Sequence, residues 1–443
     1  MVEANIKIIE ELKLFLECVS KDPDLRKIFS TCDVDFSRTR KLPMERIVGI
    51  IINMPKRSLS IEIADFFSHL NDNVKNCTKG AFSLQRSKLK PEFFDIWNQW
   101  IVNCFYHYYG DDVKRWRGFI LQAVDGSTCY LLNNDEIIDY FGAHKHPGGA
   151  IAMGRILQLY DVLNKTTIWG QLCPIKVSEP ALMANKVSGL RSDSLTIFDR
   201  GFASYGLMYQ MINEETPRHF IIRCKLTHNK EVEAFARSGK TSRIIELRPG
   251  YKAIQMLKSN GYMVTCDTPI RIRMVKFNLP NGEKEILLTN LLDEKCYKVE
   301  TLKEVYSLRW GIETSYGKQK NQQQMEQFSG HRVICIMQDF AASILIANLQ
   351  SLIEKQCKNK LTQINARRKL NYQINCNLSW AALKYNIVKL FLGSETEEIL
   401  MHLQLAFEQN IEPVRPGRKY PRLTKARRIS GKYQTFTNYK RAI

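Results

Sequence analysis

The sequence predicts a mixed α/β fold with helical regions at both ends and a strand-rich centre. Apolar residues at helical spacing fill the first 112 residues and recur after about residue 331. Between these regions, short apolar stretches separated by turn residues predict strands. With 443 residues, the chain is long enough for two or three domains and a large core.

Residues 1–112 predict a compact helical domain. The expected helices cover 8–21, 44–54, 58–70 and 81–109, the last being a pair broken at Pro91. Lys and Arg lie between the apolar stripes, and a helical domain with basic turns can grip a DNA duplex. We therefore predict a DNA-binding N-terminal domain. A helical bundle with a solvated basic face is the alternative.

Residues 113 to about 226 predict strands that alternate with helices. Ser178 is a suitable N-cap, and Pro180 falls in the first turn of the helix that follows it. Such alternation favours a sheet with helices packed on it. Strands are expected over 118–128, 155–164, 166–175, 194–202 and 219–226, with helices over 178–190 and 205–215.

Two of these expected strands end in an aspartate. Asp125 is followed by Gly126, and Asp199 is followed by Arg200 and Gly201. Asp and Gly are common turn residues, so each motif alone is at least as often structural as functional.

The stretch YSLRWGIETSYGKQK carries the third motif. Its polar residues are Tyr306, Arg309, Glu313 and Lys320, at offsets of 0, 3, 7 and 14. On one continuous helix that starts near Leu302, these offsets fall within about 60° of one another. A carboxylate can hold a metal ion, and Arg and Lys beside it can hold phosphate oxygens. Solvated surface ion pairs are the alternative.

Together the acids form a set in the order strand Asp, strand Asp, helix Glu. Carboxylates on rigid elements are the ligands that two oxygen-preferring divalent cations require. Asp125, Asp199 and Glu313 are therefore the predicted metal ligands and catalytic residues. His144 and His146 lie in a Gly/Pro-rich loop, and we interpret them as substrate contacts or plain loop residues and not as metal ligands.

These motifs resemble those of the DDE transposases of the insertion-sequence family four, which have a ribonuclease-H-like catalytic core. The family signature is Tyr, two residues, Arg, three residues, Glu, six residues and Lys, and the stretch from Tyr306 to Lys320 matches it without a gap. Asp125-Gly126 and Asp199-Arg200-Gly201 match the other two acid motifs. The resemblance covers residues 118–320.

The resemblance implies cut-and-paste DNA transposition by hydrolysis of phosphodiesters and strand transfer. It assigns two Mg²⁺ ions, replaceable by Mn²⁺, to the three acids. It assigns DNA and phosphate binding to Tyr306, Arg309 and Lys320. The implied partners are double-stranded DNA, as terminal inverted repeats and target, and a second copy of the chain in a paired-end complex. A catalytically silent DNA-binding regulator and a nuclease on the same core are the alternatives.

The catalytic core is expected over 113–330, interrupted by a β-rich insertion over about 227–300. Strands are expected over 241–248, 262–267 and 269–292, with a hairpin turn at LPNGE (279–283). The resemblance implies that this insertion is all-β.

The C-terminal part predicts a helical region over 331–412, with helices over 337–356, 382–393 and 396–409. A basic tail follows over 413–443, with ten Lys or Arg residues and no acid. We expect this tail to contact the DNA backbone. A solubilising tail is the alternative.

Composition favours a polyanionic partner, and a basic membrane-surface protein is the alternative. The net charge is +20 and the pI is about 9.4. We find no signal peptide and no apolar run of about 18 residues, which predicts no membrane partner. The twelve cysteines form no CxxC pair, so we expect reduced thiols and a cytoplasmic, nucleoid-associated protein.

Overall fold

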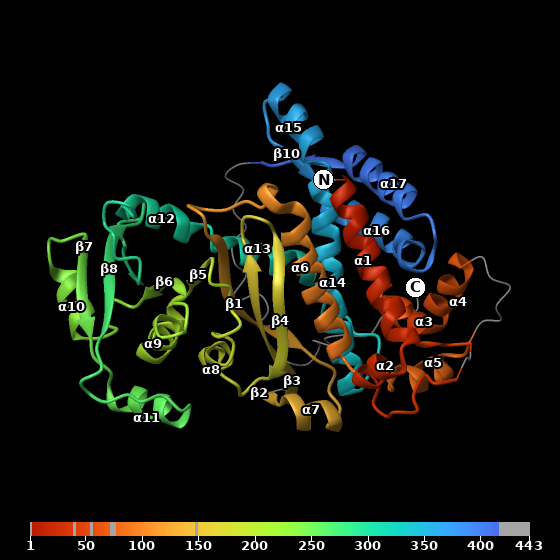
Figure 1. The fold of residues 1–443 in the computed structure, drawn as a ribbon, viewed down its shortest axis with the longest axis horizontal. Helices are drawn as coiled ribbons and strands as arrows, with labels where there is room; N and C mark the ends of the chain where they lie inside the picture. The colour runs from red at the N-terminus through yellow and green to blue at the C-terminus, as the bar shows by residue number, and fades with distance from the viewer. Residues whose placement is uncertain (1, 39–40, 54–55, 71–76, 147–148, 416–443) are drawn as a thin grey trace.

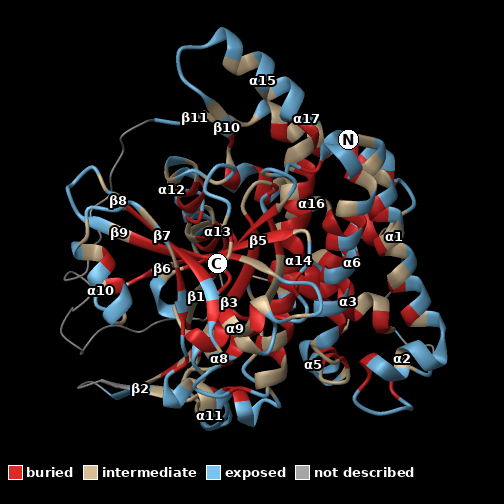
Figure 2. Cartoon of the chain, turned by 60° about the vertical axis from the view of Figure 1, so that its left-hand side comes forward, coloured by how far each residue is buried: buried red, intermediate tan, exposed pale blue. Residues whose placement is uncertain are grey.

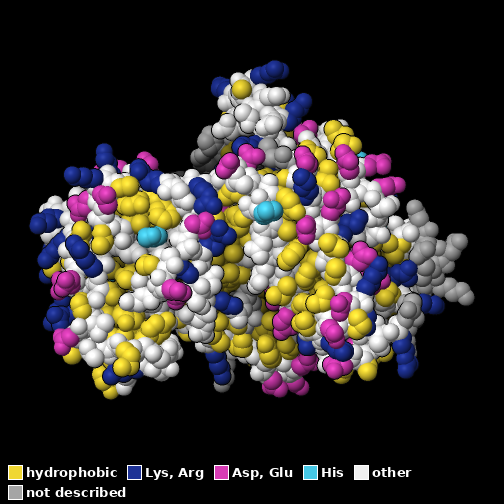
Figure 3. Space-filling view, viewed as in Figure 1, with side chains coloured by type: hydrophobic (Ala, Val, Ile, Leu, Met, Phe, Trp, Pro, Cys, Tyr) yellow, Lys and Arg dark blue, Asp and Glu magenta, His cyan; other side chains and the backbone are white. Residues whose placement is uncertain are grey.

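The computed structural model describes residues 2–38, 41–53, 56–70, 77–146 and 149–415. Figure 1 shows a central sheet that extends to the left, with a helical body on its right. The described residues form a nine-stranded sheet in the order β2-β3-β1-β5-β6-β9-β8-β7, with β4 paired to β3. Lys and Arg side chains gather along the left-hand edge of the face in Figure 3, over α10 and β7–β8.

Five strands form the core of the sheet, in the order β4-β3-β1-β5-β6. β1, β5 and β6 are parallel to one another, whereas β3 is antiparallel to both β1 and β4. This arrangement confirms the predicted α/β class with a ribonuclease-H-like core. The strands are β1 (Ile120–Tyr130), β3 (Gly149–Asp161), β4 (Thr166–Pro174), β5 (Ser194–Phe198) and β6 (His219–Cys224).

Helices cover both faces of this core. α8 (Glu179–Ala184) and α9 (Tyr205–Ile212) pack on one face around Val124, and α12 (Val299–Ser307) and α13 (Trp310–Asn321) pack on the other around Leu121 and Ala123. Ser178 caps α8 as predicted, accepting a hydrogen bond from the Ala181 N–H at 3.4 Å. The helix is shorter than the predicted 178–190.

The insertion extends the core sheet. β9 (Lys284–Thr289) pairs with β6, and β8 (Ile270–Asn278) and β7 (Ser242–Leu247) continue outward, all antiparallel. The predicted hairpin turn joins β8 to β9, with the Leu279 N–H donating to the Glu283 carbonyl at 2.8 Å. Gly282 supplies the left-handed backbone that this turn needs, at φ 83°.

The expectation of an all-β insertion is wrong, because the segment contains α10 (Lys230–Arg237) and α11 (Tyr251–Ser259). Asn229 starts α10 by accepting a hydrogen bond from the Val232 N–H at 2.8 Å, and Val232 and Phe235 are buried. A cap followed by apolar residues three apart favours a helix. The predicted strand at 262–267 is irregular instead, because hydroxyl groups of this segment hydrogen-bond its own backbone.

The helices of the two chain ends share one hydrophobic core, although they are far apart in sequence. The predicted break at Pro91 is confirmed, since it lies between α5 and α6. The N-terminal helices are α1 (Val2–Lys21), α2 (Pro23–Phe29), α3 (Met44–Ile52), α4 (Leu59–His69), α5 (Lys79–Arg86) and α6 (Glu92–Tyr109). The C-terminal helices in this core are α14 (Val333–Gln356), α16 (Cys376–Leu392) and α17 (Thr396–Gln409).

Helix α14 lies in the middle of this body, and Figure 2 shows most of it as buried. Its 24 residues are long and apolar enough to cross a membrane by length and composition. The expectation that no such stretch occurs is therefore wrong. Packing explains the composition, because 78% of the apolar window is buried inside the molecule, as in the core helix of a large domain.

The remaining elements are short. The predicted basic tail lies outside the described residues from position 416 onward.

All twelve cysteines are free thiols, and seven are buried. The other elements are η1 (Gly110–Asp112), α7 (Asp135–Phe141), β2 (Ala143–His146), η2 (Arg200–Phe202), α15 (Lys358–Arg367), β10 (Tyr372–Ile374) and β11 (Ile411–Pro413).

Candidate active site

The register of three parallel strands places charged residues side by side. Val124 on β1 pairs with Phe198 on β5, and Phe198 pairs with Ile222 on β6. The next residues on the three chains are Asp125, Asp199 and Arg223. Neighbouring strands lie about 4.8 Å apart, so the two predicted aspartates come from adjacent positions where the parallel pairing of β1 and β5 ends. The predicted turn at Asp125 is wrong, because β1 continues to Tyr130 and stays paired with β3.

The third motif lies on two helices, and the predicted single helix is wrong. α12 ends at Ser307 and α13 begins at Trp310. Between them the Arg309 N–H donates to the Tyr306 carbonyl at 3.1 Å, and the Ile312 N–H donates to the Arg309 carbonyl at 3.1 Å. These i to i+3 bonds are tighter than those of an α-helix, so the angles of one uniform helix do not apply across the turn.

Arg309 joins two of the three acids. Its Nη2 donates to Glu313 Oε1 at 2.7 Å, and its Nη1 lies 3.7 Å from Asp125 Oδ1. Arg309 is only 4% exposed, and its guanidinium lies over the Trp310 ring, 5.3 Å from the ring centroid. A buried cation between two carboxylates holds the helix residue Glu313 close to the strand residue Asp125.

Asp199 has a different cation. Arg223 Nη2 lies 3.0 Å from Asp199 Oδ1, and Arg223 Nη1 donates to Glu285 Oε1 at 2.7 Å. Sequence analysis missed Arg223 and Glu285. The available signal was Arg223 itself, a charge inside the otherwise apolar strand stretch HFIIRC.

Tyr306 also lies at this site. Its side chain is buried, and its hydroxyl has no hydrogen-bond partner among the described residues. Burial raises the pKa of Tyr306, while the charges of Arg223 and Arg309 oppose the rise. The hydroxyl therefore stays protonated and can donate a hydrogen bond. Phosphate binding by Tyr306 stays a prediction.

Lys320 lies apart from the acids. Its Nζ donates to the Thr128 carbonyl on β1 and lies 3.3 Å from Glu326 Oε1. Lys320 follows Glu313 by seven residues on α13, a rise of about 10 Å along the helix axis. The structure thus brings Tyr306, Arg309 and the acids together and leaves Lys320 beyond them. Its role in phosphate binding stays a prediction.

Gly126, next to Asp125, leaves space for an ion pair that sequence analysis missed. A Cβ on Gly126 would lie 2.1 Å from Glu179 Cδ, so the Glu179 carboxyl group occupies that space. Arg155 Nη1 donates to this carboxylate. Because successive strand residues face opposite sides of a sheet, Glu179 packs on the face away from the Asp125 side chain. Nothing in the sequence indicated this contact.

The electrostatic environment of Asp125 is unusual for an aspartate. Burial raises its pKa to about 6; Arg309 opposes this rise, and the charges of Glu313 and Asp199 add to it. The Asp125 carbonyl accepts a hydrogen bond from the Tyr316 hydroxyl at 2.9 Å, which fixes β1 against α13.

We expect Asp125→Asn to become increasingly stabilising, relative to the native residue, as pH rises from 4 to 8. With a folded pKa of about 6, Asp125 keeps its proton in the folded state where the unfolded chain has lost it. Protonated Asp125 therefore stabilises the folded state fully below about pH 4, and this stabilisation is lost as the pH rises to 6. The free energy of unfolding of Asp125→Asn, minus that of the native chain, should be larger at pH 8 than at pH 4 by about 2 kcal/mol. Urea unfolding without divalent metal measures it, and equal gains at both pH values would contradict this prediction.

The donor set suits divalent cations. Asp125, Asp199 and Glu313 offer carboxylate oxygens, and the buried Asp199 Oδ1 accepts no hydrogen bond from any described residue despite the nearby guanidinium. In the present side-chain arrangement, the described residues form no group of three His, Cys, Asp or Glu close enough to hold a metal ion. His144 lies on β2, paired through its backbone with Ile151. Arg309 provides the positive charge between Asp125 and Glu313.

A family model and a sequence relative agree with these motifs. A family model described as a transposase DDE domain matches residues 139–349, a range that includes Asp199 and Glu313 and begins after Asp125. Transposase InsG for insertion sequence element IS4 of Escherichia coli (strain K12) is 23% identical over 304 residues, or 66% of this chain. The match spans 65% of that relative's length. A piggyBac transposase synaptic complex with hairpin DNA has a TM-score of 0.42 at 12% identity, covering 96% of this chain and 88% of that chain.

Proposed function

We propose that this chain, which belongs to the DDE transposases of the insertion-sequence family four, carries out cut-and-paste transposition of an insertion sequence. One observation carries the proposal: Asp125 and Asp199 directly follow the last paired residues of the parallel strands β1 and β5, and Arg309 ties Glu313 to Asp125. A set of partly exposed carboxylates held on strands and a helix suits metal-dependent chemistry on phosphodiesters. The partners are double-stranded DNA, namely the terminal inverted repeats and the target, and a second copy of the chain. The site of action is the cytoplasm, at the nucleoid.

In this proposal Asp125, Asp199 and Glu313 hold two Mg²⁺ ions, which Mn²⁺ can replace. When bound, such ions activate water and stabilise the developing charge on phosphodiester oxygens. Holding them requires the ionised form of Asp125, whose pKa of about 6 permits this at neutral pH.

The other residues position DNA. Arg309 Nε is buried and has no hydrogen-bond partner among the described residues, so it remains as a donor to a phosphate oxygen. The Tyr306 hydroxyl is a second donor beside it. Lys320 offers a positive charge further along α13, and the basic tail beyond Pro413 adds contacts to the DNA backbone.

Incubating the purified chain with labelled element ends, a target plasmid and Mg²⁺ tests the proposal. Joined products support transposition. Cut but unjoined ends would favour a nuclease on the same core. Bound and uncut DNA would favour a DNA-binding regulator and would contradict the catalytic assignment.

We expect Lys320→Ala to raise the DNA concentration for half-maximal cleavage by about 10-fold, the loss of a charge-assisted hydrogen bond worth about 1.5 kcal/mol. The Mg²⁺ concentration for half-maximal cleavage should not change, because Lys320 does not contact the acids. Cleavage titrations against DNA and against Mg²⁺ separate the two effects. Lys252→Ala, at an exposed lysine on α11, is the control. If both titrations match the native chain, Lys320 serves only its contacts with Thr128 and Glu326.

A further inference from the structure

A group of lysines lines a cavity away from the three acids. A cavity of about 270 Å³ opens where α6, the β3–β4 turn, α13, α14, α15 and β10 meet, elements that come together in the upper middle of Figure 1. We call it the lysine cavity, because five lysines line it: Lys114, Lys165, Lys318, Lys355 and Lys358.

The lysine cavity carries an unbalanced positive charge. Asp112 and Glu354 are the carboxylates among its lining residues. Within the described parts of the chain, none of the five lysines has a carboxylate within ion-pair distance. In contrast, Arg309 and Arg223 at the acid site, the group formed by Asp125, Asp199 and Glu313, are both paired with carboxylates. Unpaired ammonium groups gathered around one hollow favour an anion.

The turn that presents Lys165 is firmly built. Fully buried Asp161 accepts hydrogen bonds from the N–H groups of Leu163 at 3.1 Å and Asn164 at 3.0 Å. Lys165 itself has φ 54°, a left-handed conformation that is uncommon for a residue with a side chain. Its carbonyl accepts a hydrogen bond from Ser351 Oγ at 2.6 Å. This strained backbone, held on both sides, fixes the Lys165 position at the cavity.

Lys355 is held from the opposite wall. Its Nζ donates to Ser351 Oγ at 3.1 Å and lies 4.8 Å from the centroid of the Phe105 ring. Burial lowers the pKa of Lys355 to about 7, and the charges of Lys165 and Lys114 lower it further, against Asp161 and Glu354. Burial also lowers the pKa of Lys165. An anion in the cavity would favour the protonated form of both lysines.

Helix α13 connects the two sites. Lys318 follows Glu313 by five residues, which is about 7.5 Å along the axis and about 140° around it. The same helix therefore presents Glu313 to β1 and Lys318 to the lysine cavity. A phosphate held by Lys318 would lie at a fixed position relative to the acids.

We propose that the lysine cavity binds a backbone phosphate of the DNA on which the acids act. The choice of DNA as the source of the phosphate rests on the proposed function. The binding of a phosphate group rests only on the cavity and its five lysines.

The first test measures the salt dependence of binding to a duplex that carries an element end, without Mg²⁺. Replacing Lys165, Lys318 and Lys355 together by Gln should reduce the slope of log K against log salt by at least about 0.9, the value for one phosphate contact. Lys252→Gln on α11 should leave the slope unchanged. If the triple variant does not fold, Lys318→Gln alone should still reduce the slope, because Lys318 is half-exposed and has no ion pair to lose. An unchanged slope in a folded variant would overturn the proposal.

The second test distinguishes DNA from free phosphate. Acylation of the cavity lysines in the native chain, followed by mass spectrometry, should slow in the presence of the duplex and also of inorganic phosphate, with Lys252 as the reference. Protection by inorganic phosphate alone would overturn the DNA assignment. Protection by neither would overturn the site. Both tests measure binding and not catalysis. A chain that binds the duplex but never joins DNA would therefore contradict the proposed function without contradicting this inference.

Discussion

Replacing Asp125 or Asp199 by Asn, or Glu313 by Gln, is expected to lower DNA cleavage by more than about 100-fold. Removal of a residue that only orients a metal ligand costs about 10- to 100-fold, so loss of a ligand should exceed that range. Binding of element ends should stay within about threefold of the native value, because that binding depends mainly on phosphate contacts by basic residues. Gel-based cleavage at saturating Mg²⁺ and a separate binding titration measure the two quantities.

Asp139→Asn is the matched control, since Asp139 is an exposed acid on α7 outside the acid site. It should cleave like the native chain. Retained cleavage in any one of the three test variants would remove that residue from the catalytic set. Equal loss of cleavage and of end binding would indicate a damaged fold instead of a missing ligand, and thermal unfolding of each variant checks this.

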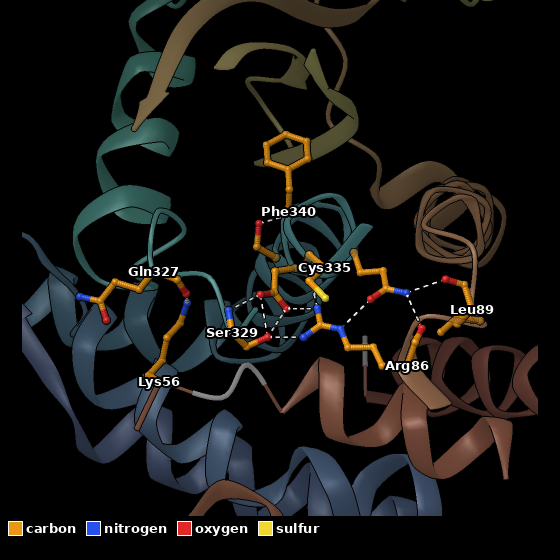
Figure 4. Close-up of polar contacts among 10 residues, drawn as sticks. Lys56, Arg86, Leu89, Gln327, Ser329, Cys335 and Phe340 are labelled. Atoms are coloured by element: carbon orange, nitrogen blue, oxygen red, sulfur yellow. Dashed lines mark hydrogen bonds and ion pairs between the residues drawn. The ribbon is translucent and has the colours of Figure 1, made fainter. Parts of the chain in front are cut away.

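Arg86→Ala is expected to have the largest effect on stability, a loss of about 3–5 kcal/mol, because it leaves a buried charge without its partner. Arg86 on α5 is 1% exposed, and its Nη2 donates to Asp339 Oδ1 at 2.8 Å and to the Cys335 carbonyl at 2.9 Å. Figure 4 shows this network together with Ser329, whose hydroxyl contacts the same guanidinium. Urea unfolding followed by circular dichroism measures the loss.

Two comparisons sharpen this prediction. Lys27→Ala breaks an exposed pair with Asp24, at 3.1 Å, and should cost less than about 1 kcal/mol. Combining Arg86→Met with Asp339→Leu should be less destabilising than Arg86→Ala, since neither charge then stays buried alone. A loss below about 1 kcal/mol for Arg86→Ala would show that the pair is not essential to the helical body.

A separate contact, made by Lys56, connects the N-terminal part of the chain to the segment that follows α13. Lys56 Nζ donates to the Gln324 carbonyl at 2.7 Å and to the Gln327 carbonyl at 3.0 Å, in the segment between α13 and α14. Figure 4 shows Lys56 beside Gln327. This segment follows the helix that carries Glu313. The predicted DNA-binding domain would thereby be attached to the helix that carries Glu313.

Local chemistry made much of the fold predictable. Ser178 caps α8, Pro91 separates α5 from α6, and Gly282 closes the β8–β9 turn, as their residue types indicate. The interruption at Arg309 and the helices α10 and α11 were not predicted. Periodicity does not distinguish an α-helical turn from a tighter one, and short amphipathic helices give weak signals beside strong strand patterns.

The sequence by itself determined which residues could form the site: the aspartates of the Asp-Gly and Asp-Arg-Gly motifs, a spaced Tyr-Arg-Glu-Lys series and an excess of basic residues. Tertiary structure decided which of them meet. The parallel register of β1, β5 and β6 placed Asp125 beside Asp199 and brought in Arg223, and buried Arg309 drew Glu313 to Asp125. The lysine cavity likewise exists only after four distant segments pack together, because contacts between residues far apart in the chain depend on sheet register and packing and not on local preference.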